Sequence, residues 1–270
     1  MAQRLGIVDA QVHLWEAGSP QQPTHDDHEF RTLDQLIMDM DEAGVARAII
    51  TPRVWEGFDN AFVRRAAAAH PDRIRAMGTL DITDRQIGTV LDRWLDDPVM
   101  VCARLIAFTR PHHLYDGADG ELWAAAEANR VPVMVAAPGS LERIGDIAET
   151  HPELKIAIDH MGMRSGQSMR QRKRAVATLL SLSTLHNVAV KVSAAPLFAH
   201  DDYPYRSMHE DLRAVVDAFG PRRCFWGTDL SRLPCTYQQA VTMFTDHLTW
   251  LDDAALELVM GRALMEWVRW

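Results

Sequence analysis

Eight short apolar runs recur along the chain, and they constrain its fold more than any other feature of the sequence. They occupy residues 6–8, 46–50, 76–80, 101–106, 131–135, 155–158, 188–192 and 224–227. Nearly continuous apolar runs of this length are typical of parallel strands that are buried on both faces. Segments with helical spacing of apolar residues lie between most of them, at 33–43, 60–70, 122–129, 141–150, 169–185, 237–251 and 253–268.

Strands that alternate with helices predict parallel β-α units, and eight such units close into a (β/α)8 TIM barrel. A doubly wound open sheet is the alternative architecture. No Gly/Ser tract and no low-complexity segment marks a linker. We therefore expect residues 1–270 to form a single domain.

The composition limits which classes of binding partner and which cellular compartment we expect. A formal net charge of −9 disfavours binding to nucleic acid, because such a surface repels phosphate groups. No run approaches the roughly 20 apolar residues that cross a bilayer, and the N-terminus shows no signal-peptide pattern. Cys102, Cys224 and Cys235 are odd in number and lack metal-type spacing, as expected of free thiols in the cytoplasm. The oligomeric state stays open, and a homo-oligomer is compatible with the sequence.

Gln11 and His13 are the most informative polar residues, because they follow the first apolar run at once. Side chains two residues apart on an extended segment point the same way. We therefore expect both to face one pocket. A His-x-His pair at this place would be a metal-binding signature, and here the first His is a Gln.

Other polar residues lie on or just after the later strands, with Arg104 near the middle of its strand. They are Thr51, Arg53, Asp81, Arg104, Asp159, His160, Lys191, Ser193, Thr228 and Asp229. Barrel enzymes carry their reactive groups at the carboxyl ends of the strands. A barrel with a purely structural role would not need His13, His160 and Asp229 on three strands at one end. This set suits attack of water on an electrophilic carbon.

We expect Asp229 to accept a proton from water, while His13 and His160 polarise a carbonyl group, relay a proton or hold a metal. Positive charge from Arg53, Arg104 and Lys191 predicts an anionic small-molecule substrate, because Arg clamps a carboxylate and Lys acts as a point charge. In addition, Trp15 and Trp55 are candidates for stacking on a planar substrate ring.

At these residues the sequence resembles the amidohydrolase superfamily, in particular the amidohydrolase-related branch of lactonases and decarboxylases. Residues 9–15 resemble the Asp-x-His-x-His-x-Trp motif of that branch, and residues 158–162 resemble its Asp-His-x-Gly strand end. Residues 103–105, 190–193 and 226–229 resemble three further strand motifs. The resemblance implies a distorted (β/α)8 barrel, hydrolytic chemistry with Asp229 as the base, and Arg104 as a ligand of a substrate carboxylate.

Gln11 departs from the pattern of the metal-dependent members. An amide oxygen is a poor zinc ligand, so we expect no cofactor; a single zinc ion on His13, His160 and Asp229 is the alternative. The preferred function is opening of a carboxylated sugar lactone or a muconate- or pyrone-type lactone. Decarboxylation of an aromatic or muconate-like acid is a second hypothesis, and a non-catalytic barrel that binds a small acid is a third.

Overall fold

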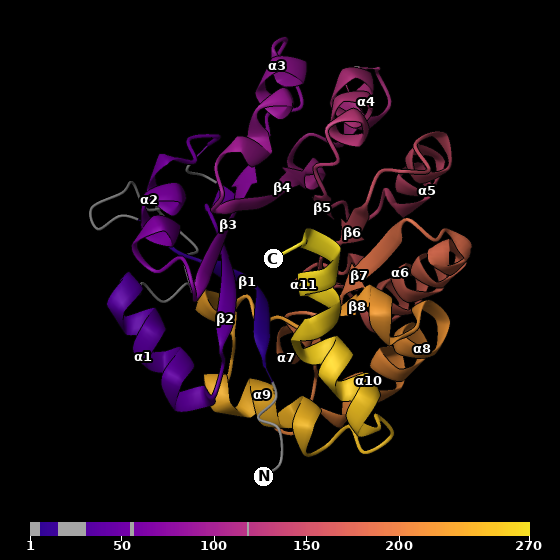
Figure 1. Cartoon of the computed structure of the whole chain (residues 1–270). Helices are drawn as coiled ribbons and strands as arrows, with labels where there is room; N and C mark the ends of the chain where they lie inside the picture. Colours follow the sequence, from indigo (N-terminus) through magenta and orange to yellow (C-terminus); the bar gives the residue numbers. More distant parts are fainter. Residues whose placement is uncertain (1–5, 16–30, 55–56, 118) are drawn as a thin grey trace.

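The computed structural model describes residues 6–15, 31–54, 57–117 and 119–270, and its centre is a sheet of eight parallel strands in the order β1 to β8 (Figure 1). The strands are β1 Val8–His13, β2 Arg47–Thr51, β3 Ile74–Thr79, β4 Met100–Ile106, β5 Val133–Ala136, β6 Ile156–Ile158, β7 Val188–Lys191 and β8 Cys224–Phe225. Each strand pairs with the next one along the chain, so the sheet curls into a (β/α)8 barrel. The predicted TIM-barrel fold is confirmed.

The seam between β8 and β1 is closed by individual contacts. The amide of Ala10 donates to the carbonyl oxygen of Trp226 at 3.1 Å, and the amide of Asp229 donates to that of Gln11 at 3.0 Å. The carboxylate of Asp9 also accepts hydrogen bonds from the backbone amide and the hydroxyl group of Thr228. A side chain on Gly227 would lie only 3.1 Å from the Ala10 nitrogen, so glycine allows the two chain segments to approach here.

Side chains inside the barrel form layers with the two-residue period of a strand. One apolar layer contains Ile49, Met77, Cys102, Met134, Ala157, Ala189 and Phe225. Two residues further along β4 and β7 come Arg104 and Lys191, and Asp159 follows β6 in the same phase. On β1 the register shifts between Asp9 and Val12. The buried polar residues therefore lie directly on this apolar layer, which we call the apolar floor.

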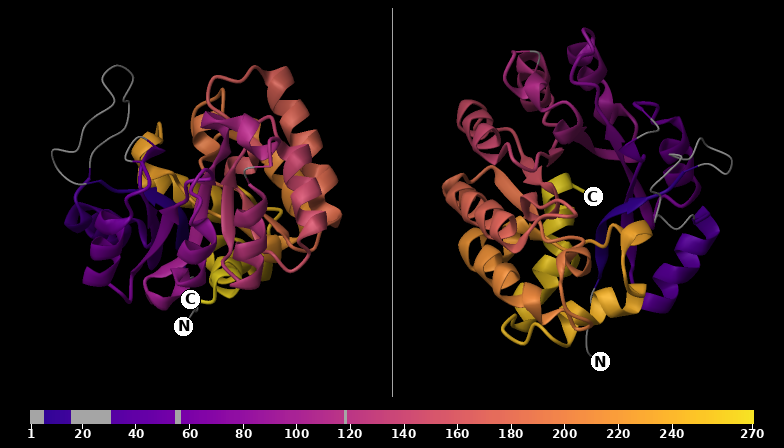
Figure 2. Two further views of the ribbon diagram at one scale, coloured as in Figure 1. Left: turned by 90° about the horizontal axis from the view of Figure 1, so that it is seen from above. Right: turned by 180° about the vertical axis from the view of Figure 1, so that it is seen from behind.

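Helices surround the barrel on its outside (Figures 1 and 2). The main ones are α1 Leu33–Ala43, α2 Ala61–Ala69, α3 Ile87–Asp92, α4 Gly120–Ala128, α5 Leu141–Thr150, α6 Met169–Ser181, α8 His209–Phe219 and α9 Tyr237–Thr245, with a short α7 at Ala195–Phe198. Helices α3 and α8 were not among the segments expected from the sequence. No helix in the described part of the chain has the length and apolar character to span a bilayer.

Local sequence signals fix several helix ends. Thr32 and Gln35 form a reciprocal capping box at the start of α1, and Gly44 ends the helix in the left-handed conformation, with φ of 74°. Ser168 begins α6 by the same device. Helix α1 therefore ends at Ala43, the last residue of the segment that the sequence predicted.

The expected helix at residues 253–268 is instead interrupted. It consists of α10 Asp253–Glu257, a π-helical turn at Leu258–Arg262 and α11 Ala263–Val268. A Cβ atom on Gly261 would clash with the carbonyl oxygen of Gly6, so glycine allows the interrupted helix to pass close to the backbone before β1. Helix α11 crosses the end of the barrel where the strands begin (Figure 1). Its Leu264 and Trp267 pack against the apolar layer from that side.

Candidate active site

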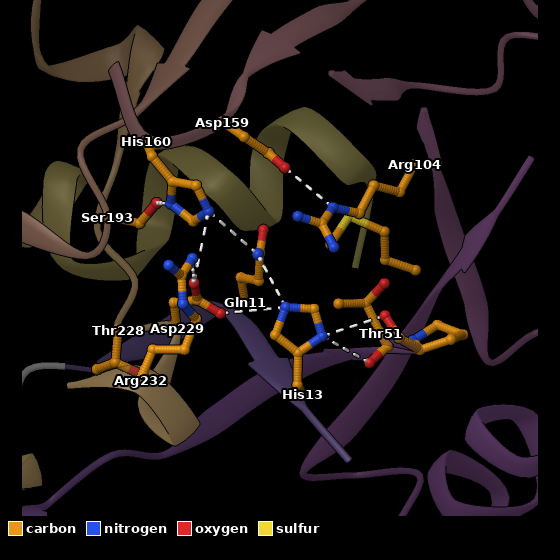
Figure 3. A network of polar contacts seen from close by, with 12 residues as sticks. Gln11, His13, Thr51, Arg104, Asp159, His160, Ser193, Thr228, Asp229 and Arg232 are labelled. Atoms are coloured by element: carbon orange, nitrogen blue, oxygen red, sulfur yellow. Dashed lines mark hydrogen bonds and ion pairs between the residues drawn. The ribbon is translucent and has the colours of Figure 1, made fainter. Parts of the chain in front are cut away.

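Two ion pairs share Asp159, which follows β6, and lie just above the apolar floor; Figure 3 shows the pair with Arg104. Arg104 Nε donates to Oδ2 of Asp159 at 3.0 Å, and Lys191 Nζ donates to Oδ1 at 2.8 Å. All three residues are buried. Burial raises the pKa of Asp159, but Lys191 and Arg104 outweigh that effect and hold the pKa well below its usual value. Asp159 is therefore ionised at neutral pH, and its single negative charge lies between two buried cations.

Lys191 also determines how the Gln11 side chain is oriented. Its Nζ lies 2.5 Å from Oε1 of Gln11. The amide nitrogen of Gln11 then lies on the other side, 3.4 Å from Nε2 of His13 and 3.4 Å from Nε2 of His160. The expectation that Gln11 and His13 face the same space is thus met. The group between the two imidazole rings is a hydrogen-bond donor.

His13 is held by its other ring nitrogen. Nδ1 lies 3.2 Å from the carbonyl oxygen of Thr51 and 3.1 Å from that of Pro52. Nε2 lies 3.1 Å from Oδ1 of Asp229. Because carbonyl oxygens only accept hydrogen bonds, Nδ1 must carry a hydrogen. The ring therefore presents Nε2 to both Gln11 and Asp229.

Asp229 is almost fully buried, at 1% exposure. Burial raises the pKa of its carboxyl group, but His13, His160 and Arg232 together hold that pKa well below the usual value. Nε2 of His13 lies 3.1 Å from Oδ1, and this close contact is a main cause of the low pKa. A buried carboxylate oxygen of this kind is ready to accept a proton from a small molecule.

His160 lies opposite His13. Its Nδ1 is 2.8 Å from Oγ of Ser193, and its Nε2 is 3.7 Å from Oδ2 of Asp229. Burial lowers the pKa of His160 to about 4, and the carboxylates of Asp229 and Asp159 only partly offset this. His160 is therefore neutral at pH 7.

The backbone is unusual where the last three strands end. His160, Ala194 and Asp229 have φ of 52°, 55° and 56°, in the left-handed region that non-glycine residues rarely adopt. Such residues cost roughly 1–3 kcal/mol each and persist where surrounding contacts hold them. At His160 and Asp229 the turn directs a polar side chain over the barrel mouth instead of continuing the strand.

A cavity of about 230 Å³ opens above these groups. His13, His160 and Asp229 contribute to its wall. The other charged wall residues are Arg53, Arg104, Arg164, Arg232 and Asp159, so four guanidinium groups face two carboxylates. Phe108, Phe198, Ile106 and Met163 add apolar surface. The cavity fits a small anion with an apolar part.

The remaining residues predicted to bind substrate lie elsewhere. Gln11 and Lys191 are fully buried beneath the cavity and contact each other instead of lining the wall. Trp15 is 4% exposed, and the guanidinium group of Arg53 lies 3.8 Å from its ring centre, so its ring supports Arg53 and is not part of the wall. Trp55 lies outside the described residues.

Sequence reasoning missed several wall residues. Arg164 follows the turn after β6, Phe108 lies in a 3-10 turn after β4, and Phe198 ends the short helix α7 after β7. The surplus of basic residues after strand ends was a usable signal for Arg164, and nothing in the sequence placed the two phenylalanines. Asp159 was recognised only as a strand-end residue, although it anchors both Arg104 and Lys191.

The trio of His13, His160 and Asp229 does not fit a divalent cation in this arrangement. The N–H groups of Gln11 point between the two imidazole rings, and the Lys191 ammonium group lies directly behind the amide. Hydrogen-bond donors and positive charge repel a metal ion. In the described residues, the group whose ligand atoms all lie within 4.8 Å is instead His112, His113 and Asp116, in a loop after β4.

Comparisons with solved structures give matches over nearly the whole chain. A probable 2-pyrone-4,6-dicarboxylic acid hydrolase from Acinetobacter baumannii, solved with citric acid bound, has a TM-score of 0.81, 16% identity and coverage of 98% of this chain and 100% of its own. An amidohydrolase from Burkholderia multivorans with bound zinc has a TM-score of 0.80, 16% identity and coverage of 97% and 99%. The 5-carboxyvanillate decarboxylase from Sphingomonas paucimobilis has a TM-score of 0.71, 14% identity and coverage of 98% and 99%. At these identities the likeness concerns the fold.

A search of curated proteins gave no match. The family model described as amidohydrolase (Amidohydro_2) matches residues 8–267. That range runs from the first residue of β1 into the end of α11, and it contains every residue of the site described above. The chain therefore belongs to the amidohydrolase family.

Proposed function

We propose that the protein is a hydrolase that opens a lactone bearing a carboxylate, with Asp229 as the base that activates water. The observation that carries this proposal is the carboxylate of Asp229, which is buried and ionised, lies in the wall of the cavity and has Nε2 of His13 3.1 Å from its Oδ1. An ionised carboxylate in this position can accept a proton from water within hydrogen-bonding distance.

The reaction then proceeds in two steps. Asp229 takes a proton as the water oxygen bonds to the ring carbonyl carbon, and the carbonyl oxygen becomes an oxyanion. The bond between that carbon and the ring oxygen then breaks, and the proton held by Asp229 passes to the leaving oxygen, directly or through Nε2 of His13, 3.1 Å away. The guanidinium groups of the wall neutralise the oxyanion and bind the substrate carboxylate.

No step in this scheme uses a metal ion. The donor N–H groups of Gln11 occupy the space that a cation on His13 and His160 would need. We therefore infer hydrolysis without a metal, in which the activated lactone ester needs only a base and positive charge around its oxygen.

The test is a pH-indicator screen of sugar lactones, muconolactones and pyrone carboxylates with wild-type protein and Asp229→Asn, with and without a chelator. The substitution should reduce turnover by roughly 10²–10⁴-fold, which is the usual contribution of a general base. Residual activity within tenfold of wild type would show that Asp229 is not the base. Loss of wild-type activity with chelator would overturn the metal-free scheme.

Decarboxylation of a small acid would use the same guanidinium groups to bind the substrate. The products separate the two reactions, because a lactonase releases an acid and no CO2. Detection of CO2 from aromatic acids, with no acid release from any lactone, would replace the lactonase proposal.

A further inference from the structure

Lys191 and Gln11 lie beneath the cavity and do not line it, but the Gln11 amide contacts His13 and His160, which do. Lys191 and Gln11 are both 0% exposed, and the ammonium group of Lys191 has hydrogens and no lone pair. Burial lowers the pKa of Lys191, while Asp159 at 2.8 Å favours its charged form. The contact at 2.5 Å identifies the Gln11 atom that faces Lys191 as oxygen, so the orientation of the amide is defined.

The amide nitrogen carries two hydrogens, and it has two imidazole neighbours, both at 3.4 Å. A donor facing Nε2 is favourable only where that nitrogen presents a lone pair. On His160 the hydrogen of the neutral ring must then be on Nδ1, which donates to Ser193 Oγ at 2.8 Å. The serine hydroxyl can accept this bond as well as it could donate one, so it does not itself select the tautomer.

We propose that Lys191 and Gln11 act as a positioning pair that holds His160 in the tautomer with hydrogen on Nδ1 and a lone pair on Nε2. This inference rests on the proposed hydrolysis for its purpose. In that tautomer the lone pair of His160 Nε2 accepts from Gln11, so this nitrogen makes no hydrogen bond to Asp229, and the carboxylate of Asp229 stays available to accept a proton from the attacking water. In the opposite tautomer, Nε2 would donate to Oδ2 of Asp229, 3.7 Å away, and compete with the water.

His13 provides an internal comparison. Its Nδ1 faces two backbone carbonyl oxygens, so its hydrogen stays on Nδ1 whatever Gln11 does. Nδ1 of His160 faces only the Ser193 hydroxyl, which can either donate or accept a hydrogen bond. A change in the Gln11 amide should therefore move the hydrogen on His160 and leave Nδ1 of His13 protonated.

The experiment uses protein with 15N-labelled histidine, and the imidazole tautomers are read by long-range 1H–15N correlation at neutral pH without substrate. The variant is Gln11→Glu, which keeps the shape of the side chain but replaces the donor with an acceptor. Met77→Leu is the matched control, because Met77 Sδ lies 3.9 Å from Lys191 Nζ and the substitution leaves the Gln11 amide itself unchanged. Thermal unfolding of each variant establishes that the fold is retained.

We expect the Nδ1–H tautomer of His160 in wild type and Met77→Leu, and hydrogen on Nε2 in Gln11→Glu. Lys191→Met should give a partial shift in the same direction, because the amide is then free to turn. An Nε2–H tautomer in wild type, or an unchanged tautomer in folded Gln11→Glu, would overturn the proposal. The tautomer measurements need no substrate, so they stay valid if no lactone is hydrolysed. A negative tautomer result would likewise leave the lactone screen valid.

With a lactone substrate in hand, Gln11→Glu should lower kcat more than it raises KM, because Gln11 does not line the cavity that binds substrate. A loss of about 10-fold or more in kcat is expected when an N–H group on Nε2 of His160 competes with water for the Asp229 carboxylate. If Gln11→Glu shifts the His160 tautomer but leaves kcat unchanged, the tautomer does not matter for catalysis. That result would contradict the role proposed for the pair in the reaction.

Discussion

The amide nitrogen of Gln11 lies 3.4 Å from Nε2 of His13 and 3.4 Å from Nε2 of His160. It occupies the space in which a cation bound by the two imidazole rings would lie. A histidine at position 11 would offer a lone pair in this space, whereas the glutamine offers hydrogens. The difference between an acceptor and a donor at one residue therefore separates a metal site from a hydrogen-bonded site in the same barrel. This relationship gives the first prediction.

Gln11→His should create a zinc site with His13, His160 and Asp229, because zinc prefers imidazole and carboxylate ligands. We expect about one equivalent of zinc per chain after dialysis, measured by elemental analysis, against none in the parent. The experiment should be done in a His113→Ala background, because His112, His113 and Asp116 have ligand atoms within 4.8 Å of one another on the surface. Equal zinc contents in the two proteins would show that this one residue does not decide metal binding.

Arg104→Met should weaken binding of a carboxylated lactone more than binding of its ester. Arg104 lies in the cavity wall, and its guanidinium group is anchored by Asp159 at 3.0 Å. A charge-assisted hydrogen bond to a carboxylate contributes roughly 1.5–3 kcal/mol, so KM for the acid should rise by about 10- to 100-fold. The ester is the internal control, because it shares the ring and lacks the charge. Equal increases for acid and ester would exclude Arg104 as the carboxylate ligand.

The rate should not depend on protonation of Asp229 or His160 at neutral pH. The pKa of Asp229 is held well below its usual value, and burial lowers the pKa of His160 to about 4, so both keep their reactive forms from pH 8 down to about 5. We expect no loss of kcat/KM from these groups over that range. The check is a pH–rate profile of wild type and Ser193→Ala, which removes the partner of His160 Nδ1. A decline near pH 6 that moves in Ser193→Ala would contradict the low pKa of His160.

The sequence predicted eight strands and the shared orientation of Gln11 and His13, because both follow from periodicity along short segments. Its first run at 6–8 overlaps β1 only at Val8, because β1 continues through the polar residues to His13. It did not predict α3, whose six residues are too few to show a helical repeat. Helix α8 has the pattern in Leu212, Val215, Val216 and Phe219, and there the signal was overlooked. The contact between Lys191 and Gln11 spans 180 residues and depends on how β7 and β1 meet across the barrel, which no local pattern determines.

Asp9 should make the protein less stable as the pH rises from about 4 to 7. Burial raises the pKa of this carboxyl group to about 6, although hydrogen bonds from Thr228, Tyr237 and the amide of Gln11 oppose the shift. A carboxyl group whose pKa is higher in the folded protein stabilises the fold below its unfolded pKa, and the contribution disappears as the pH rises through the folded pKa. For a shift of about two pKa units, the loss is about 3 kcal/mol.

The comparison that isolates this effect is Asp9→Asn, which keeps the shape of the side chain and cannot ionise. Free energies of unfolding from urea titrations at pH 4, 5, 6 and 7 should show wild type losing stability relative to Asp9→Asn at each step. Any constant cost of the new amide facing the Thr228 and Tyr237 hydroxyl groups cancels in this difference. A difference that stays level across the four pH values would mean that Asp9 is already ionised at pH 4, and that its hydrogen bonds across the seam from β1 outweigh its burial.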